Sequence, residues 1–588
     1  MIRFLGPILG GVFALLVVRQ AGAEEASKIN WQPWSDSIFE QAKREHRFVL
    51  LDLEAVWCHW CHVMDAQTYS DPKVVALIKS KYLAVKVDQD SRPDISNRYE
   101  DYGWPATVVF NSDGSEIVKR QGYLPPKLMA SILQAIIEDP SPGPSITKEP
   151  PIEPRSEAGL TNEERAKLEQ VLRADYDQKN HGWGTVQKFL DWDVIEFCIE
   201  KTISGEHDFE RMARETLDAQ EQLIDPVWGG VYQYSTDGDW NHPHFEKIMQ
   251  FQAENLRLYA EAYALWKDPK YLAGAEKIRG YLRNFLTSPE GAFYTSQDAD
   301  LVEGRHSADY FARDDAARRQ LGLPRIDEHI YARENGWAIN ALATFYGVTG
   351  DKSALNDATR AAEWIVSHRS LGKGGFSHDE KDTAGPYFGD NVYMARAFLT
   401  LYQVTADRKW LQRAQETVQF AADHFQSAAG YVAFAHSLGE KLAPKPQTDE
   451  NSTFARLTNL LRHYTGQAEN RARAEHAMRY LAAPSVAERR GFLVGGILLA
   501  DRELSRPPLH LTIVGPKNDT SARKLFAAAL RQPAPYKRME WWDEKEGPLP
   551  NPDVPYPTLD RAAAFVCTDR SCSAPIFETA KIDAFIRR

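Results

Sequence analysis

Two cysteines separated by two residues form the part of this sequence best suited to chemistry. Cys58 and Cys61 stand in the run Trp57-Cys58-His59-Trp60-Cys61, directly after residues 48–53, an apolar segment typical of a buried strand. If a helix begins at Cys58, its N-terminus and the neighbouring His59 stabilise the thiolate form of that cysteine. Such a pair carries out thiol–disulfide exchange, with Cys58 as the nucleophile and Cys61 as the resolving thiol.

Two further residues stand at spacings that would serve this exchange. Asp52 lies six residues before Cys58, at the end of the predicted strand, where a buried carboxylate can relay a proton to the resolving thiol. Pro105 follows Trp104 and precedes the strand predicted at residues 106–110, and a cis bond there would place a substrate backbone beside the sulfurs. The candidate catalytic residues are therefore Asp52, Trp57, Cys58, His59, Cys61 and Pro105.

Other interpretations of the cysteine pair remain open. Cys58 to His62 also matches C-x-x-C-H, the motif for covalent haem attachment. A zinc site would need a second well-placed pair of ligands, and none is evident in this part of the sequence. A purely structural disulfide would need neither Asp52 nor Pro105. We expect no cofactor and no metal.

The remaining cysteines have no such neighbours. Cys567 and Cys572, separated by four residues near the end of the chain, are most simply a structural disulfide. Cys198 lies on a helix predicted at residues 194–201 and is expected to be a buried thiol.

The elements that must position the first cysteine pair alternate between helix and strand. Residues 24–138 contain predicted strands at 48–53, 82–87, 106–110 and 117–119, with a helix around Phe39 and Ala42, a helix at 72–79 and a last helix at 127–137. Residues 139–159 are predicted to be a linker, because a stretch of 15 residues inside this range contains six prolines. We therefore expect an α/β domain of the thioredoxin type, ending before the linker.

Residues 160–505 are predicted to be helical with a long repeat. Asp268, Asp351 and Asp407 are each followed by Leu four residues later, by Ala seven residues later and by a Gly-aromatic turn 23 residues later. Six such turns between residues 182 and 491 give about one helical hairpin per 62 residues. The repeat predicts an all-α (α/α)6 toroid, with an open helical array as the alternative. Residues 506–588 are expected to form a small α/β segment.

Polar clusters at the predicted starts of the toroid helices suggest a second site. In a closed ring these starts would meet at one end, where carboxylates and aromatic side chains could bind a sugar and perform acid/base chemistry. The alternative is that the polar residues are helix caps and the aromatic residues are core. The candidate cleft residues are His244, Glu246, Asp298, Asp300, Trp337 and Asp390.

Composition and the first residues limit the partners. The 588 residues are 43% hydrophobic and 26% charged with a net charge of −12, which fits a globular protein and argues against nucleic acid and anionic lipid as partners. Residues 1–23 combine Arg3, an apolar run and Ala21-Gly22-Ala23, the pattern of a secretory signal peptide cleaved near Ala23. We expect a periplasmic or secreted protein without a membrane span after cleavage, although Arg19 leaves an uncleaved anchor as the alternative.

The residues together resemble a known family. Asp52, the Trp57-to-Cys61 motif and Pro105 resemble thioredoxin, and nearly all of residues 30–588 resemble the thioredoxin-domain proteins similar to spermatogenesis-associated protein 20. The most specific matching segments are residues 57–64, 86–88, 92–94, 103–105, 243–247, 298–300 and 567–575. The resemblance implies a thioredoxin fold joined to an (α/α)6 toroid similar to sugar epimerases and six-hairpin glycosidases.

The working hypothesis is thiol–disulfide exchange with a protein or a small thiol as the partner. Two alternatives remain, a glycan hydrolase or sugar epimerase acting in the toroid cleft and a non-catalytic binding protein.

Overall fold

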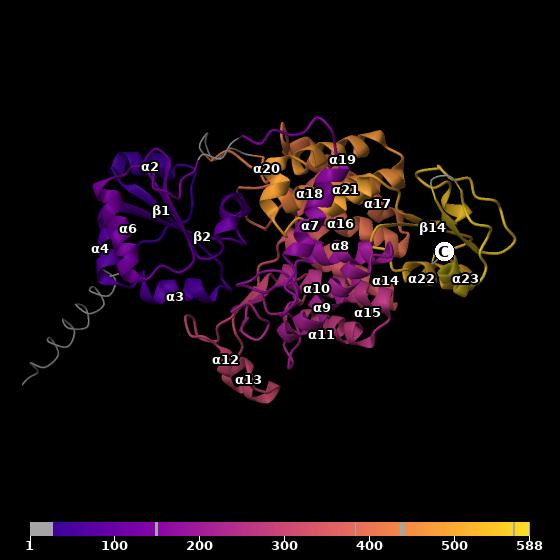
Figure 1. Cartoon of the computed structure of the whole chain (residues 1–588), viewed down its shortest axis with the longest axis horizontal. Helices are drawn as coiled ribbons and strands as arrows, with labels where there is room; N and C mark the ends of the chain where they lie inside the picture. The colour runs from indigo at the N-terminus through magenta and orange to yellow at the C-terminus, as the bar shows by residue number, and fades with distance from the viewer. Residues whose placement is uncertain (1–27, 148–150, 383, 436–441, 569–570, 587–588) are drawn as a thin grey trace, which may run out of the picture. The chain divides into compact units, whose positions relative to one another are not determined.

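The computed structural model describes residues 28–147, 151–382, 384–435, 442–568 and 571–586. The chain divides into two compact units (Figure 1). The first comprises residues 1–149 together with Val302–His306 and Ser437–Ala443, and the second comprises the rest. The predicted signal peptide and the alternative anchor fall on residues 1–23, which lie outside the described residues.

The first unit is built on a four-stranded sheet in the order β2-β1-β3-β4. The central strand β1 pairs with β2 in parallel and with β3 in antiparallel orientation, and β4 extends the sheet beyond β3. The strands are β1 (Phe48–Glu54), β2 (Tyr82–Asp88), β3 (Ala106–Phe110) and β4 (Glu116–Gln121). This is the predicted α/β domain, with its four strands at the expected places along the chain.

Successive residues of β1 point to opposite sides of the sheet, and each side carries its own core. Val49 and Leu51 pack in one core with Ile38 of helix α2 (Ile38–Glu45). Leu50 packs in the other core with Met64 of α3 and with the helices that follow. These helices are α3 (His59–Gln67), α4 (Pro72–Lys81) and α6 (Pro126–Glu138), while the short α5 (Pro93–Ser96) and η1 (Asn97–Tyr102) lead into β3.

The second unit is a closed ring of helices. Six inner helices pack successively on one another, and the last packs on the first. The inner helices are α8 (Trp192–Ile203), α10 (Met249–Trp266), α14 (Ala332–Thr349), α16 (Phe388–Thr405), α18 (Thr448–Thr465) and α21 (Gly495–Leu504). The contact between α21 and α8 confirms the predicted toroid and excludes an open array.

Outer helices alternate with the inner ones along the chain. They bury one face only, whereas helices such as α14 and α16 are buried nearly all round, as expected for the inner layer of a two-layered ring. The outer helices are α7 (Asn162–Ala174), α9 (His207–Gln220), α11 (Pro269–Phe285), α15 (Lys352–His368), α17 (Arg408–Phe425) and α19 (Ala468–Leu481).

A recurring amide explains the repeat in the sequence. Asn391 of α16 accepts a hydrogen bond from the backbone N–H of Phe376, at 3.0 Å, and donates to the Tyr387 carbonyl at 2.8 Å. Asn335 binds Phe293 and Asn451 binds Tyr431 in the same way. Each fixes a Gly-aromatic turn to the start of an inner helix, so the polar residue and the turn recur together.

The outer helices have a recurring cap as well. Asp268, Asp351 and Asp407 each accept a hydrogen bond from the backbone N–H two residues later, at the starts of α11, α15 and α17. Each thereby satisfies one of the N–H groups that a helix leaves unpaired at its start.

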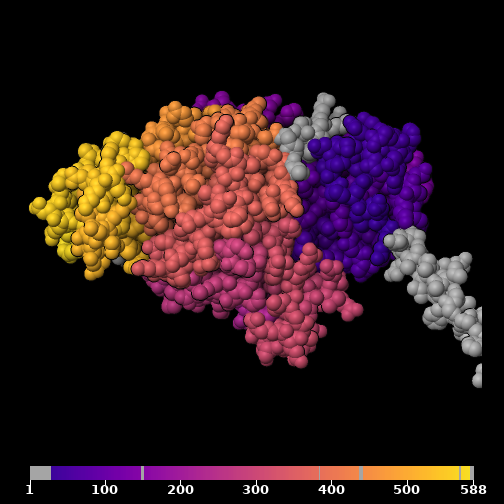
Figure 2. Space-filling model, turned by 180° about the vertical axis from the view of Figure 1, so that it is seen from behind, coloured from indigo at the N-terminus to yellow at the C-terminus, as the bar shows by residue number. Residues whose placement is uncertain are grey.

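The C-terminal part is a three-stranded sheet in the order β15-β14-β16 and belongs to the second unit. Figure 2 shows that it packs directly against the ring. Within this contact, β15 touches α16 and α18. Its elements are β14 (Leu509–Val514), α22 (Thr520–Leu530), β15 (Lys537–Trp542), β16 (Ala563–Cys567) and α23 (Thr579–Ile586). Cys567 and Cys572 are joined by a disulfide.

None of the helices within the described ranges combines the length and the apolar composition needed to cross a membrane.

Candidate functional site

The cysteine pair lies at the N-terminus of α3. Cys58 is the N-cap residue, and its Sγ accepts a hydrogen bond from the backbone N–H of Cys61 at 3.1 Å. The two cysteines form a disulfide, and each is about nine-tenths or more buried. Because the positive end of the helix dipole is at this terminus, the Cys58 sulfur occupies the position where a thiolate is stabilised.

Pro105 lies at the same end of the sheet as the cysteine pair. The Trp104–Pro105 bond is cis, as the sequence predicts, and β3 begins at the next residue. Ala106 is the register partner of Leu53 on β1, the strand that leads to Cys58. The start of β3 and the end of β1 therefore meet where the cysteine motif begins.

Asp52 is the centre of a buried charge network. Its carboxylate accepts a hydrogen bond from the Tyr69 hydroxyl at 3.0 Å, and the Lys86 ammonium lies 3.4 Å away. Burial raises the pKa of Asp52 to about 7, although the Lys86 charge acts in the opposite direction. A carboxyl group with this pKa can both accept and release a proton near neutral pH.

Lys86 connects Asp52 to two other carboxylates. Its ammonium donates to Glu54 at 2.8 Å and to Asp65 at 2.7 Å. The oxygens of Asp52, Glu54 and Asp65 lie close enough together to hold a metal ion. The positive charge that pairs with all three carboxylates is the Lys86 ammonium.

Trp57 and Trp60 stand on either side of Cys58 and His59 in the motif. The buried Trp57 donates its indole N–H to Asp90 at 2.8 Å, which holds the segment before Cys58. Trp60, between the cysteines, is 40% exposed and contacts the rings of His59 and Tyr123. An exposed aromatic surface therefore adjoins the disulfide.

A segment from far along the chain completes the first unit beside α3. Val302–His306 forms a tight turn, in which the Arg305 N–H donates to the Val302 carbonyl at 2.9 Å. A side chain at Gly304 would lie 3.4 Å from the His62 carbonyl oxygen, so the turn lies against α3 one helical turn beyond Cys58. The His306 ring is 5.5 Å from that of His59.

The second candidate site lies at one end of the ring. Because consecutive inner helices are separated by one antiparallel outer helix, all inner helices run in the same direction and their starts meet at this end. His244 and Glu246 precede α10, with 3.9 Å between His244 Nδ1 and Glu246 Oε1. The prediction that His244 and Glu246 stand at the start of a helix is wrong. The helix α10 begins at Met249, and His244 belongs to the short strand β6 (Pro243–His244).

Asp390 contacts two other parts of the ring. Its Oδ1 accepts a hydrogen bond from the Arg333 backbone N–H of α14 at 2.8 Å and lies 2.9 Å from His378 Nδ1. Although burial acts against it, the Asp390 carboxylate raises the pKa of His378 to about 9. The Arg333 guanidinium also lies over the Trp337 ring, at 5.0 Å, so the structure brings Trp337 and Asp390 into one group.

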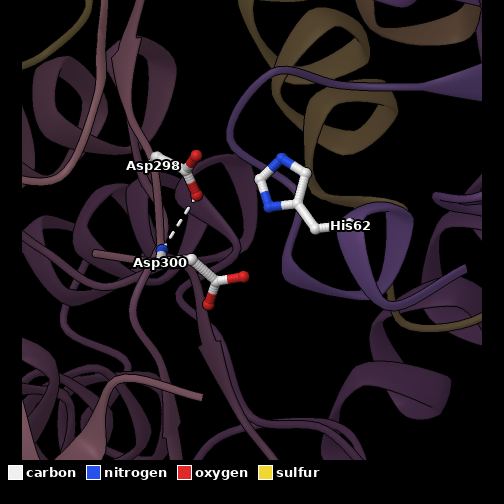
Figure 3. A group of neighbouring side chains, drawn as sticks. All are labelled: His62, Asp298 and Asp300. Atoms are coloured by element: carbon white, nitrogen blue, oxygen red, sulfur yellow. Dashed lines mark hydrogen bonds between the residues drawn. The ribbon is translucent and has the colours of Figure 1, made fainter. Parts of the chain in front are cut away.

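Asp298 and Asp300 form a third group. They follow β8 (Ser296–Gln297), and the Asp300 backbone N–H donates to Asp298 Oδ1 at 2.9 Å (Figure 3). Both carboxyl groups are buried.

Asp390 does not cap its own helix. The N-cap positions of α14, α16 and α18 are Tyr331, Tyr387 and Gln447, whose side chains make no capping hydrogen bond with described residues. Asp390 accepts instead from the neighbouring helix.

Sequence reasoning missed several residues of these sites. Lys86 and Tyr69 around Asp52, Asp90 beside Trp57, and Arg333 and His378 beside Asp390 were not predicted as site residues. Lys86 had a signal, because it belongs to a motif of the resembled family, but its position opposite Asp52 depends on the strand register.

The chain is similar to several known proteins. The family model Thioredox_DsbH, described as "Protein of unknown function, DUF255", matches residues 21–138. The chain is 21% identical to spermatogenesis-associated protein 20 of Homo sapiens, over 94% of this chain and 89% of that protein. It is 32% identical to thiol:disulfide interchange protein DsbD 2 of Pseudomonas aeruginosa, over 16% of this chain and 17% of that protein.

Among solved structures, cellobiose 2-epimerase from Spirochaeta thermophila is 12% identical, with a TM-score of 0.44, covering 58% of this chain and 96% of that chain. The chain thus carries a thioredoxin-like domain of the DsbH type and is similar over most of its length to spermatogenesis-associated protein 20.

Proposed function

We propose that this protein is a thiol–disulfide oxidoreductase that acts outside the cytoplasm through Cys58 and Cys61. The observation that carries the proposal is the Cys58–Cys61 disulfide at the N-terminus of α3, with Cys58 as the N-cap residue. The similarity to a thiol:disulfide interchange protein over part of the chain supports the same chemistry.

The reduced protein would react in two steps. The Cys58 thiolate attacks one sulfur of a substrate disulfide, so that a mixed disulfide forms and the other substrate sulfur leaves as a thiolate. Cys61 then loses its proton and attacks the Cys58 sulfur, which restores the Cys58–Cys61 disulfide and releases the second substrate thiol. Two electrons pass from the cysteine pair to the substrate, and the reverse sequence oxidises a dithiol.

Asp52 and Pro105 have separate roles in this scheme. With its pKa of about 7, Asp52 accepts the proton that Cys61 loses and returns it to a leaving sulfur. Pro105 directly precedes β3, whose start meets the end of β1 where the cysteine motif begins, so an extended substrate bound to Cys58 would lie beside it.

The test is reduction of insulin disulfides by the full chain, with dithiothreitol as the electron donor. Cys58→Ser is expected to abolish the acceleration, and Cys61→Ser is expected to accumulate a mixed disulfide with the substrate. The matched control is Cys198→Ser, since Cys198 is buried and outside the disulfide, and it should retain full activity. Equal rates for the protein and Cys58→Ser would overturn the proposal.

The location has its own test. A secreted or periplasmic protein should begin near Glu24 after cleavage, which N-terminal sequencing of the protein from its native host would detect. A retained Met1 in a membrane fraction would favour the anchor instead.

A second candidate function concerns the end of the ring where Trp337 and Asp390 lie. Arg333 joins an aromatic face to a carboxylate there, and sugar binding uses both kinds of group. Sugar-dependent stabilisation of the protein, lost in His244→Ala and Asp390→Asn, would support a glycan hydrolase, an epimerase or a sugar-binding module. Turnover of the sugar would distinguish the enzymes from the binding protein.

A further inference from the structure

The ring contains a cavity of about 130 Å³ toward the C-terminal ends of its inner helices. Glu261 of α10, Val348 of α14 and Gln403 of α16 line it, all in the second halves of their helices. Residues 530–537 of the C-terminal part complete the wall. The candidate sugar site lies at the starts of the same helices, so the two sites are at opposite ends of the ring.

Most of the charges that line this cavity neutralise one another. Arg257 donates to Glu196 and Glu254, each at 2.7 Å, and to Glu261 at 3.1 Å. Arg456 pairs with Glu196 and lies 2.8 Å from Glu503. These guanidinium groups therefore have carboxylate partners at hydrogen-bonding distance.

Arg396 is different. Among the described residues, the only carboxylate within ion-pair distance of its guanidinium is Glu254, at 3.8 Å, and Glu254 already accepts the shorter bond from Arg257. Arg396 lies in the middle of α16 between the fully buried Ala395 and Ala397, yet 21% of its side chain is accessible. Arg396 lines the cavity, and of the three arginines that line it, it has the longest distance to a carboxylate among the described residues.

The rest of the wall indicates what Arg396 could bind. A guanidinium pairs best with a planar carboxylate, to which it can donate two parallel hydrogen bonds. Apolar side chains make up much of the lining, including Ile199, Ala264, Val348, Leu399, Val404 and Leu460. A ligand with one carboxylate and a short apolar body matches both features.

The carboxylates in the wall limit the charge of the ligand. Burial raises the pKa of Glu261 and of Glu503 to about 7, so each is partly neutral near pH 7. Glu196 remains ionised, because the nearby guanidinium groups of Arg257 and Arg456 lower its pKa despite its burial. Lys537, also in the wall, donates to the backbone carbonyls of Leu530 and Gln532. Glu196 therefore keeps one negative charge in the wall, and this charge opposes a second negative charge on the ligand.

We propose that the ring binds a small organic monocarboxylate in this cavity, with the carboxylate paired to Arg396 and the apolar body against the aliphatic wall. The site is independent of the cysteine chemistry.

The experiment measures binding to the full chain by calorimetry and by the thermal unfolding midpoint. The probes are sodium butyrate and sodium benzoate, compared with butyramide, sodium sulfate and sodium chloride at equal ionic strength. Saturable binding and a raised midpoint are expected with the two monocarboxylates alone. Equal shifts with butyramide or sulfate would overturn the proposal.

Two variants test the location of binding. Arg396→Gln should weaken butyrate binding at least tenfold, and Thr344→Leu should block it by filling the cavity without altering its charge. Arg360→Gln on the outer helix α15 is the matched control and should bind as the unmodified protein does. Undiminished binding by Arg396→Gln and Thr344→Leu would place the ligand elsewhere and refute the proposal.

Discussion

The Lys86 ammonium lies 3.4 Å from the Asp52 carboxylate, and the two residues are register partners on the parallel strands β1 and β2. The attraction favours the charged form of Asp52, but burial favours the neutral form more strongly and the pKa of Asp52 rises to about 7. The sheet therefore holds a proton-exchanging group next to a permanent cation.

Asp52→Asn is expected to stabilise the oxidised protein at neutral and alkaline pH. Because the pKa of Asp52 is about 7 in the folded state and 3.8 without perturbation, its contribution to stability is present below pH 4 and is lost as the pH rises to 7. The variant should gain roughly 1–4 kcal/mol in the free energy of unfolding at pH 8, and little at pH 4. Chemical denaturation at both pH values measures this.

The same variant should slow exchange. The variant lacks the carboxylate that would accept the proton of Cys61. Mixed disulfides should therefore resolve more slowly at pH 7. Single-turnover quenching with an alkylating reagent would measure this step. A variant that is equally stable at pH 8 and equally fast would contradict the assigned burial and role of Asp52.

The Cys58 thiol should be unusually acidic. In Cys61→Ser, the rate of alkylation against pH should have its midpoint below the value of about 8.5 for a free cysteine, because Cys58 caps α3. Cys198 provides an internal control, since burial raises the pKa of its thiol and it should react only after unfolding. A midpoint at or above the free value would contradict the nucleophilic role.

Asn391→Ala should destabilise the ring by about 2–3 kcal/mol, because it leaves the buried N–H of Phe376 without its acceptor. Gln412→Ala is the control, since this exposed side chain bonds only to Glu416 among the described residues, and it should change stability by less than about 0.5 kcal/mol. Denaturation by urea compares the two. Similar effects for both variants would argue against the amide as a structural feature of the repeat.

Gly495→Ala tests the closure of the ring. A methyl group there would overlap the backbone of Asp193 and Val194 on α8, so α21 and α8 would have to separate, at a cost of about 1–3 kcal/mol. Gly280→Ala on α11 is the matched control, because its methyl group would meet nothing within 4 Å. It should instead stabilise the protein by roughly 0.5–1 kcal/mol, since Ala favours a helix over Gly. Thermal unfolding of the two variants would distinguish these opposite signs.

The sequence by itself determined the elements whose pattern is local. The continuous apolar run of β1, the cysteine motif at a helix start, and the recurring aspartates and Gly-aromatic turns are all properties of neighbouring residues. Such patterns report which face of an element is buried, and they were sufficient to predict both the thioredoxin-like sheet and the toroid.

Only the tertiary structure decided how charged residues from distant segments meet. Strand β15 was not predicted, because Arg538 and Glu540 resemble surface residues in sequence, whereas the folded chain buries both and pairs Arg538 with Asp553. The Lys86 contact depends on strand register, and the accessible Arg396 depends on ring closure. Pairing between charges is set by distance in space, which local periodicity does not encode.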